Sequence, residues 1–312
     1  MNEERVHIQG EVSIGATIVY QDKLKQQPAV VLIMGTGKAD RDGNEKKFHT
    51  NFYKTLSDQF AQMGCVCVRY DKRGTFETSG DYNTSGLSDL VKDAISVIQY
   101  TKELAYVDPS RVIVCGHSEG TMIGTLASEQ ELLAGLILLG GAGTSLKDAL
   151  LYQNRLAVLE FEKKKGLLGW LVRMQLNKEK ADQKVEKMFL KCIQSKKSRT
   201  FFSGTMLNTK WMTEHGSYTS RDFVNKLSQY NGRVLAITGT ADLSADYQVL
   251  DDFQGMEHII CYAPENVNHI LREVDDANSM MTAMKQYQRL SLNPIEPKVI
   301  EKIREWLETC VE

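Results

Sequence analysis

The chain has 312 residues, of which 42% are hydrophobic and 25% are charged, and its formal net charge is −2. This is the composition of an ordinary globular protein, without collagenous, disordered or repetitive bias. A nearly neutral chain lacks the field that would draw it to nucleic acid or to a charged membrane surface. The length suits one large domain, or a domain that carries an insertion.

The first residues, MNEERVHIQGEV, carry charge and lack the apolar stretch of a secretory signal, and no apolar run reaches the roughly 18 residues that span a bilayer. No pair among the six cysteines has Cys-x-x-Cys spacing, so no zinc or dithiol site is expected. We expect a cytoplasmic protein with buried, reduced thiols. The six are Cys65, Cys67, Cys115, Cys192, Cys261 and Cys310.

Short β-rich runs alternate with longer helical patterns. Such alternation predicts βαβ units and a mostly parallel sheet with helices on both faces. The almost wholly apolar AVVLIM at 29–34 is typical of a strand buried on both faces. In chain order we expect two strands over 6–20, strands over 29–34 and 65–71, helices over 51–64 and 87–104, strands over 111–116, 133–140, 233–239 and 257–263, and a helix over 297–310.

The alternation is interrupted between about residues 144 and 230. This segment has a helical pattern without strong strand signals, and residues 147–226 hold 17 Lys and Arg against 8 Asp and Glu. Because strands lie on either side, we expect a helical cap inserted into a core formed by 1–143 and 231–312. Residues 166–176, GLLGWLVRMQL, are too apolar for a solvated helix. Either they only dock the cap, or they line an acyl-binding site through Leu167, Leu168, Trp170, Leu171 and Met174.

The most informative motif is Gly116-His117-Ser118-Glu119-Gly120. It follows the β run 111–116 and precedes a helical segment, which is the context of a nucleophile elbow. The sharp turn holds the serine in a strained conformation, and the flanking glycines avoid crowding. The motif is short enough to occur by chance, but the strand and helix around it favour a nucleophilic Ser118.

A serine hydroxyl needs a base, and the base needs an orienting carboxylate. His269 lies in the loop after the last core strand and is the preferred base, while His258 falls within a strand run. Asp242 comes three residues after Gly239, which ends a strand, and is the preferred acid. Asp246 remains the alternative acid. If it has no catalytic role, it is expected to be a charge at a helix N-terminus.

An oxyanion formed at the substrate carbonyl needs hydrogen-bond donors. The residue after the nucleophile, Glu119, supplies one backbone N–H. The loop Gly35-Thr36-Gly37 after the strand 29–34 supplies the second, for which we select Thr36, with Gly35 and Met34 beside the substrate. A nucleotide-binding loop is disfavoured because neither the phosphate-loop ending nor the full Gly-x-Gly-x-x-Gly pattern is present.

Taken together, GHSEG, GTGKADRDGN, RYDKRG at 69–74, TGTAD at 238–242 and NVNH at 266–269 resemble the α/β-hydrolase superfamily, in its esterase and serine-aminopeptidase-like branch. The resemblance covers roughly 28–140 and 231–310. It implies an α/β-hydrolase fold and hydrolysis of an ester, amide or thioester without metal or cofactor. The sequence departs from the family in having Met34 where a histidine is usual before the oxyanion glycine, and TFETSGDY after DKRG.

The leading interpretation is a serine hydrolase acting on a small-molecule acyl substrate. Acyl transfer by the same residues remains an alternative, as does a ligand-binding protein on a hydrolase fold. We also expect an ion pair between Arg41 and Glu119 to join the two loops of the oxyanion hole, the alternative being two solvated charges. The natural substrate and the oligomeric state are left open.

Overall fold

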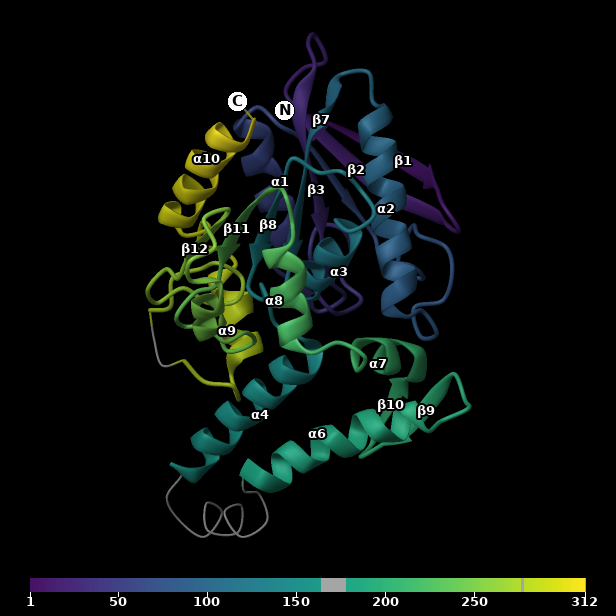
Figure 1. Ribbon diagram of the computed structural model, residues 1–312, viewed down its shortest axis with the longest axis vertical. Helices are drawn as coiled ribbons and strands as arrows, with labels where there is room; N and C mark the ends of the chain where they lie inside the picture. The colour runs from purple at the N-terminus through teal and green to yellow at the C-terminus, as the bar shows by residue number, and fades with distance from the viewer. Residues whose placement is uncertain (164–177, 276–277, 312) are drawn as a thin grey trace.

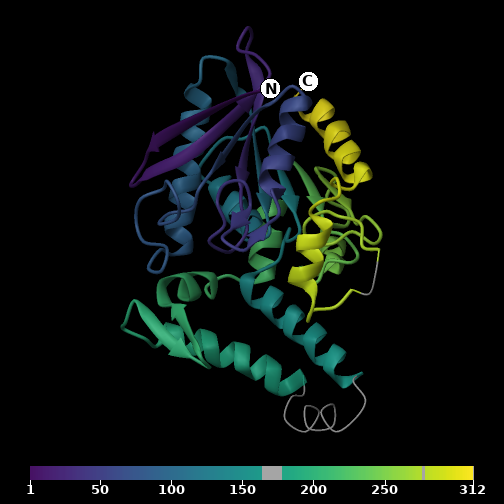
Figure 2. The same ribbon diagram turned by 180° about the vertical axis from the view of Figure 1, so that it is seen from behind.

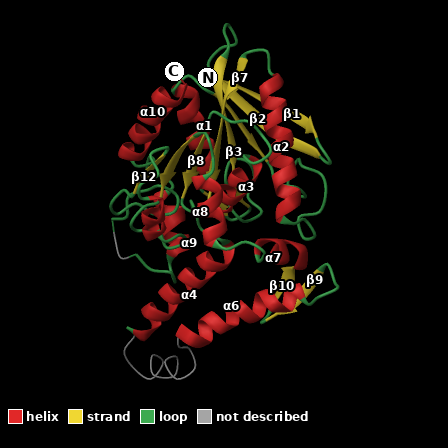
Figure 3. Ribbon diagram, viewed as in Figure 1, coloured by secondary structure: helices red, strands yellow, loops and turns green. Residues whose placement is uncertain are grey.

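A computed structural model describes residues 1–163, 178–275 and 278–311. Its centre is an eight-stranded sheet with the strand order β1-β2-β6-β3-β7-β8-β11-β12 (Figure 1, Figure 3). The strands β6, β3, β7, β8, β11 and β12 are parallel to one another, and β1 and β2 add an antiparallel edge. The predicted fold class is thus confirmed. Their bounds are β1 Asn2–Gln9, β2 Ser13–Tyr20, β3 Gln27–Ile33, β6 Val66–Tyr70, β7 Val107–His117, β8 Gly135–Leu139, β11 Arg233–Ile237 and β12 Ile259–Tyr262.

Helices cover both faces of this sheet. On β3, Val31 joins the hydrophobic cluster of one face, while its neighbour Val30 joins the cluster of the other. Both side chains are fully buried, which is why this strand is an unbroken apolar run rather than an alternating one. One face carries α2 (Leu87–Glu103), α3 (Glu119–Ala127) and α8 (Ser220–Ser228), and the other carries α1 (Phe52–Gln62), α9 (Ala283–Leu290) and α10 (Pro297–Val311).

Residues 144–230, here called the insert, leave the core after β8 and return before β11. Apart from α8, the described part of the insert lies beyond one end of the sheet (Figure 1, Figure 2). The described part of the insert is not wholly helical, because β9 and β10 form a hairpin closed by Ser203 and Gly204, both at positive φ. Positive φ at both turn positions favours glycine, which stands at the second of them. The other elements are α4 Leu146–Glu162, α6 Lys178–Ile193, β9 Arg199–Phe202, β10 Thr205–Asn208 and α7 Thr209–His215.

The part of the insert that lies beyond the sheet begins with α4 and ends where α8 starts to pack on the sheet, and these two points are tied to each other. We call this place the neck. The backbone N–H of Ser145, at the start of α4, donates to Oγ of Ser220 at 2.9 Å. Ser220, at the start of α8, donates through its own hydroxyl to the carboxylate of Asp148 at 2.5 Å. The chain therefore leaves and re-enters the core through one narrow, hydrogen-bonded site.

The cysteines follow the expectation only in part. All six are free thiols, and four are buried, but Cys261 is exposed and Cys310 is half-buried. Cys261 is on β12, the last strand of the sheet, and an edge strand leaves some side chains to solvent. Within the described ranges, no helix has the length and apolar character that crossing a bilayer would require.

Candidate active site

Ser118 stands at the sharp turn between β7 and α3, with a backbone φ of 54° and ψ of −121°. Such a conformation is strained for a residue with a side chain. A Cβ on Gly116 would lie 2.2 Å from the carbonyl oxygen of Gly120, and a Cβ on Gly120 would lie 2.1 Å from that of Ile33. Both flanking positions thus exclude any side chain, and this packing explains the glycine on each side of the serine.

The structure brings Asp242 and His269 together. Nδ1 of His269 lies 2.7 Å from Oδ2 of Asp242, and Oδ1 of the same carboxylate accepts the N–H groups of Ser244 and Ala245 at 2.7 and 3.0 Å. Because an ionised carboxylate can only accept, it selects the His269 tautomer with a proton on Nδ1. The remaining nitrogen, Nε2, is then free to take a proton from another group.

Ser118 and His269 line the same cavity, whose volume is about 370 Å³. Gly35, Thr36 and Glu119 also line it, and a Cβ on Gly35 would lie only 2.9 Å from Cβ of Ser118. The N–H of Gly35 is already donated to the hydroxyl of Tyr53, at 2.8 Å. The next N–H along this loop is that of Thr36. Glu119 is the first residue of α3, so its N–H has no carbonyl four residues back within the helix.

His117 lies in the middle of a chain of hydrogen bonds that connects two loops of the site. The Tyr53 hydroxyl accepts the N–H of Gly35, so its own proton is donated to Nδ1 of His117, at 2.9 Å. Nε2 of His117 must then carry the ring proton, which it donates to the carbonyl oxygen of His269, at 2.9 Å. Burial, with a contribution from His269, holds the pKa of His117 well below its usual value. A neutral His117 thus connects the loop of Gly35 to the loop of His269.

The predicted ion pair between Arg41 and Glu119 is wrong. Arg41 pairs instead with Asp71, through Nη2 at 2.7 Å and through its backbone N–H at 2.7 Å, and also with Glu77. Both acids follow β6, a strand that lies beside β3 in the sheet. Arg41 therefore fixes the loop after β3 to the loop after β6.

The carboxylate of Glu119 is buried and has three partners. Lys72 pairs with Oε2, while Trp211 and His215 from α7 contact Oε1 at 2.6 and 3.0 Å. Burial alone would raise the pKa of Glu119, but Lys72 and His215 hold it well below its usual range. Removing one partner of a buried pair typically costs about 3–5 kcal/mol, so this cluster is strongly constrained.

The sequence did not identify four residues of this site, namely Tyr53, Lys72, Trp211 and His215. Only Lys72 lay in a motif that had been considered, RYDKRG. The other three come from α1 and α7, and nothing local in the sequence indicates which distant group they contact. His215 precedes Asp242 in the chain, and its partner is the carboxylate of Glu119.

Other predicted residues are more distant. Met34 is 3% exposed and belongs to the hydrophobic cluster of α1, α9 and α10. His258 precedes β12, and its Nε2 contacts the carbonyl oxygen of Leu227 at 3.0 Å. Asp246 caps the short 3₁₀ helix η1 (Tyr247–Phe253) by accepting the N–H of Gln248. This is the alternative role, a charge at a helix N-terminus, that the sequence offered for Asp246. Leu167, Leu168, Trp170, Leu171 and Met174 lie outside the described residues.

The insert supplies part of the cavity wall and also contacts the loop of Asp242. Leu146 and Leu150 of α4 line the cavity. From the same helix, Tyr152 donates its hydroxyl proton to the Asp242 carbonyl oxygen at 3.1 Å, and Gln153 donates to that of Ser244 at 3.0 Å. Among the residues with described positions, no group of three or more His, Cys, Asp or Glu side chains could hold a metal ion.

Comparison with known proteins gives one family and several esterases. The model of a family described as "Serine aminopeptidase, S33" matches residues 46–253, which is more than half of the chain. Esterase EstD of Thermotoga maritima is 22% identical over 281 residues, which are 90% of this chain. The chain spans only 62% of the length of that relative.

Solved structures of esterases share the fold. An esterase of Pyrococcus furiosus matches with a TM-score of 0.61 and 11% identity, over 100% of this chain and 92% of the other. Est1E of Butyrivibrio proteoclasticus with bound ferulic acid matches with a TM-score of 0.56 and 16% identity, over 93% of this chain and 99% of the other. At these identities the likeness extends to the fold alone.

Proposed function

Because the chain belongs to the serine aminopeptidase S33 family, within the α/β-hydrolases, we propose that it is a serine hydrolase that cleaves a carboxylic ester through an acyl-enzyme on Ser118. The observation that carries this proposal is the 2.7 Å contact of His269 Nδ1 with Asp242, in a cavity that Ser118 also lines. A nucleophile, a base and an orienting carboxylate on three separate loops are the parts that acyl transfer requires.

In the first half of the reaction, Nε2 of His269 takes the proton of the Ser118 hydroxyl as the oxygen attacks the substrate carbonyl. Asp242 orients the ring and stabilises the imidazolium that results. The carbonyl oxygen becomes an oxyanion, which the backbone N–H groups of Thr36 and Glu119 stabilise. His269 then gives its proton to the leaving alcohol, and the acyl group remains on Ser118.

In the second half, water replaces the alcohol. His269 takes a proton from the water, whose oxygen attacks the acyl carbon, and the same two N–H groups hold the second oxyanion. Collapse of this intermediate returns the proton to Ser118 and releases a carboxylic acid. Four proton transfers at one nitrogen, two in each half of the reaction, thus complete the cycle.

The insert is proposed to act as the cap over this cavity and to set the preference for acyl chain length. Leu146 and Leu150 of α4 present apolar surface within the cavity, beside Met122 of α3 and Ile270 of the loop that carries His269. Apolar walls of this kind favour a hydrocarbon acyl group over a charged one. The cap would therefore decide which acyl group enters and leave the chemistry to the core.

The proposal is tested by labelling with a fluorophosphonate and by turnover of 4-nitrophenyl esters of graded chain length, with matched anilides and thioesters. We expect labelling of wild-type protein and turnover of esters, and a loss of several orders of magnitude in both for Ser118→Ala with its fold intact. Wild-type turnover by Ser118→Ala would overturn the mechanism. Faster cleavage of anilides than of esters would replace esterase with amidase, in line with the description of the family.

A further inference from the structure

The side chain of Glu119 has no part in the proposed chemistry, which uses only the backbone N–H of that residue. Nevertheless, the carboxylate is 1% exposed and has three partners. Trp211 donates its indole N–H to Oε1, His215 contacts the same oxygen, and Lys72 pairs with Oε2. Two of the three partners belong to α7, so a buried charge of the core depends on the insert for most of its hydrogen bonds.

The direction of each bond follows from the chemistry of the partners. Glu119 is held in its ionised form, so both of its oxygens can only accept. The indole N–H of Trp211 can only donate, and Nε2 of His215 must carry a proton to face the carboxylate. All the contacts therefore converge on one group and fix its position, and with it the first turn of α3.

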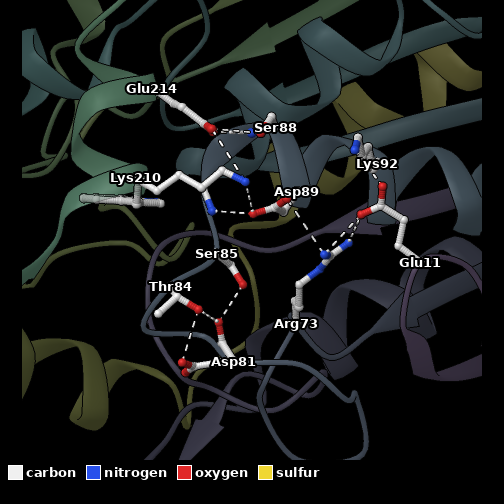
Figure 4. Close-up of polar contacts among 12 residues, drawn as sticks. Glu11, Arg73, Asp81, Thr84, Ser85, Ser88, Asp89, Lys92, Lys210 and Glu214 are labelled. Atoms are coloured by element: carbon white, nitrogen blue, oxygen red, sulfur yellow. Dashed lines mark hydrogen bonds and ion pairs between the residues drawn. The ribbon is translucent and has the colours of Figure 1, made fainter. Parts of the chain in front are cut away.

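A second set of α7 side chains is fixed as well (Figure 4). Nζ of Lys210 lies 2.7 Å from Oδ2 of Asp89, in the first turn of α2. Glu214 accepts the backbone N–H of Ser88 at 2.7 Å and its hydroxyl at 2.9 Å, and so caps the start of that helix. One short helix thus joins the N-terminus of α2 to the residue that follows the nucleophile.

We propose that α7 positions the oxyanion hole, with Trp211 and His215 as positioning residues that act through the side chain of Glu119. The inference rests on the proposed function, since it takes the Glu119 N–H as an oxyanion donor. Such donors stabilise the transition state only when they are aimed at the developing charge before the reaction begins. With α7 in place, the Glu119 side chain is held at its far end, and its N–H keeps a fixed direction.

The test is the rate at which a fluorophosphonate labels Ser118 in the full chain. The phosphonyl oxygen occupies the place of the oxyanion, so this rate reports on the donors without knowledge of the natural substrate. His215 does not line the catalytic cavity, which makes it a cleaner target than Trp211. His215→Leu removes the bond to Glu119, and His215→Gln keeps an N–H donor. Lys226→Met is the control, because it breaks a pair of α8 with Glu129 and a cation–π contact with Tyr218 at 5.8 Å, and neither contact involves Glu119.

For His215→Leu we expect labelling and kcat on 4-nitrophenyl butyrate to fall about 10- to 100-fold, less than the loss of a whole donor, while KM stays within about twofold. His215→Gln should recover most of that loss, and Lys226→Met should match the wild type. A folded His215→Leu that labels at the wild-type rate would overturn the proposal. So would a rise in KM with unchanged kcat, because it would indicate only a substrate contact.

If His215→Leu does not fold, the double variant Lys72→Met with Glu119→Ala decides the question. It keeps the N–H of residue 119, leaves no unpaired buried charge, and removes the group that α7 holds. Slowing of at least about 10-fold would support positioning by α7, and labelling at the wild-type rate would refute it. Failure of the proposed function looks different, because Ser118 of the wild-type protein would then take no label.

Discussion

Tyr53→Phe tests the hydrogen-bonded chain beneath the active site. The substitution keeps the buried ring and deletes only the hydroxyl that accepts the N–H of Gly35 and donates to Nδ1 of His117. His117 is 5% exposed, so its Nδ1 would lose its partner in a dry place, at a cost of about 1–3 kcal/mol. The N–H of Gly35 belongs to a half-buried residue that lines the cavity, and it should add less.

Activity should fall together with stability. Without the Tyr53 hydroxyl, the ring of His117 is held only by the bond from its Nε2 to the carbonyl oxygen of His269, and the position of the ring is less firmly fixed. Because that bond holds the loop of the proposed base, fluorophosphonate labelling and kcat should decrease.

Urea unfolding followed by fluorescence measures the stability, and the labelling rate measures the site. The matched control is Tyr20→Phe, which removes a hydroxyl bonded to the partly solvated Glu4. We expect this control to cost about 1 kcal/mol or less and to leave labelling unchanged. If Tyr53→Phe were as stable as the wild type and labelled at the same rate, the chain through His117 would have no role in the site.

The proposed acid can be separated from its neighbour, since Asp242→Asn should lower kcat by orders of magnitude by disturbing the tautomer of His269, whereas Asp246→Asn should cost little. A dead Asp246→Asn enzyme beside an active Asp242→Asn enzyme would reverse the assignment. Burial, aided by His269, keeps His117 neutral in the folded state, while the unfolded chain binds a proton there below about pH 6.5. Stability should therefore fall as the pH drops below about 6.5, by up to about 1.4 kcal/mol per pH unit. His117→Gln should flatten this part of the pH profile in denaturant titrations, and equal slopes in both proteins would contradict the argument.

The elements that the sequence predicted best are those whose signal is local. The run of apolar residues in β3 reflects burial of that strand on both faces. The glycines around Ser118 reflect a turn that leaves no room for Cβ atoms. Both constraints act within a few residues. The pairing of His269 with Asp242 agrees with the predicted order of loops along the carboxyl edge of a parallel sheet. Each of these could be argued from one stretch of chain or from the order of such stretches.

The contacts that could not be predicted join segments far apart in the chain. The sequence suggested Glu119 as the partner of Arg41, and only the position of β6 beside β3 brings Asp71 and Glu77 to it instead. Two of the three partners of Glu119 lie 92 and 96 residues away on α7. The hairpin β9–β10 was missed although Ser203 and Gly204 mark its turn, because lysines and short strands weaken the β pattern around it.

The neck bears on how such a protein can diversify. Where two ends of a segment meet at one hydrogen-bonded site, the segment can in principle be exchanged for another without disturbing the core. In this protein, exchange of the insert would also affect the core. Without α7, the Glu119 carboxylate would keep only Lys72 of the three side-chain partners described above. We therefore expect position 119 and the insert to change together. A related protein with a different insert should also carry a different residue after the nucleophile, one whose side chain needs no hydrogen bonds from the insert.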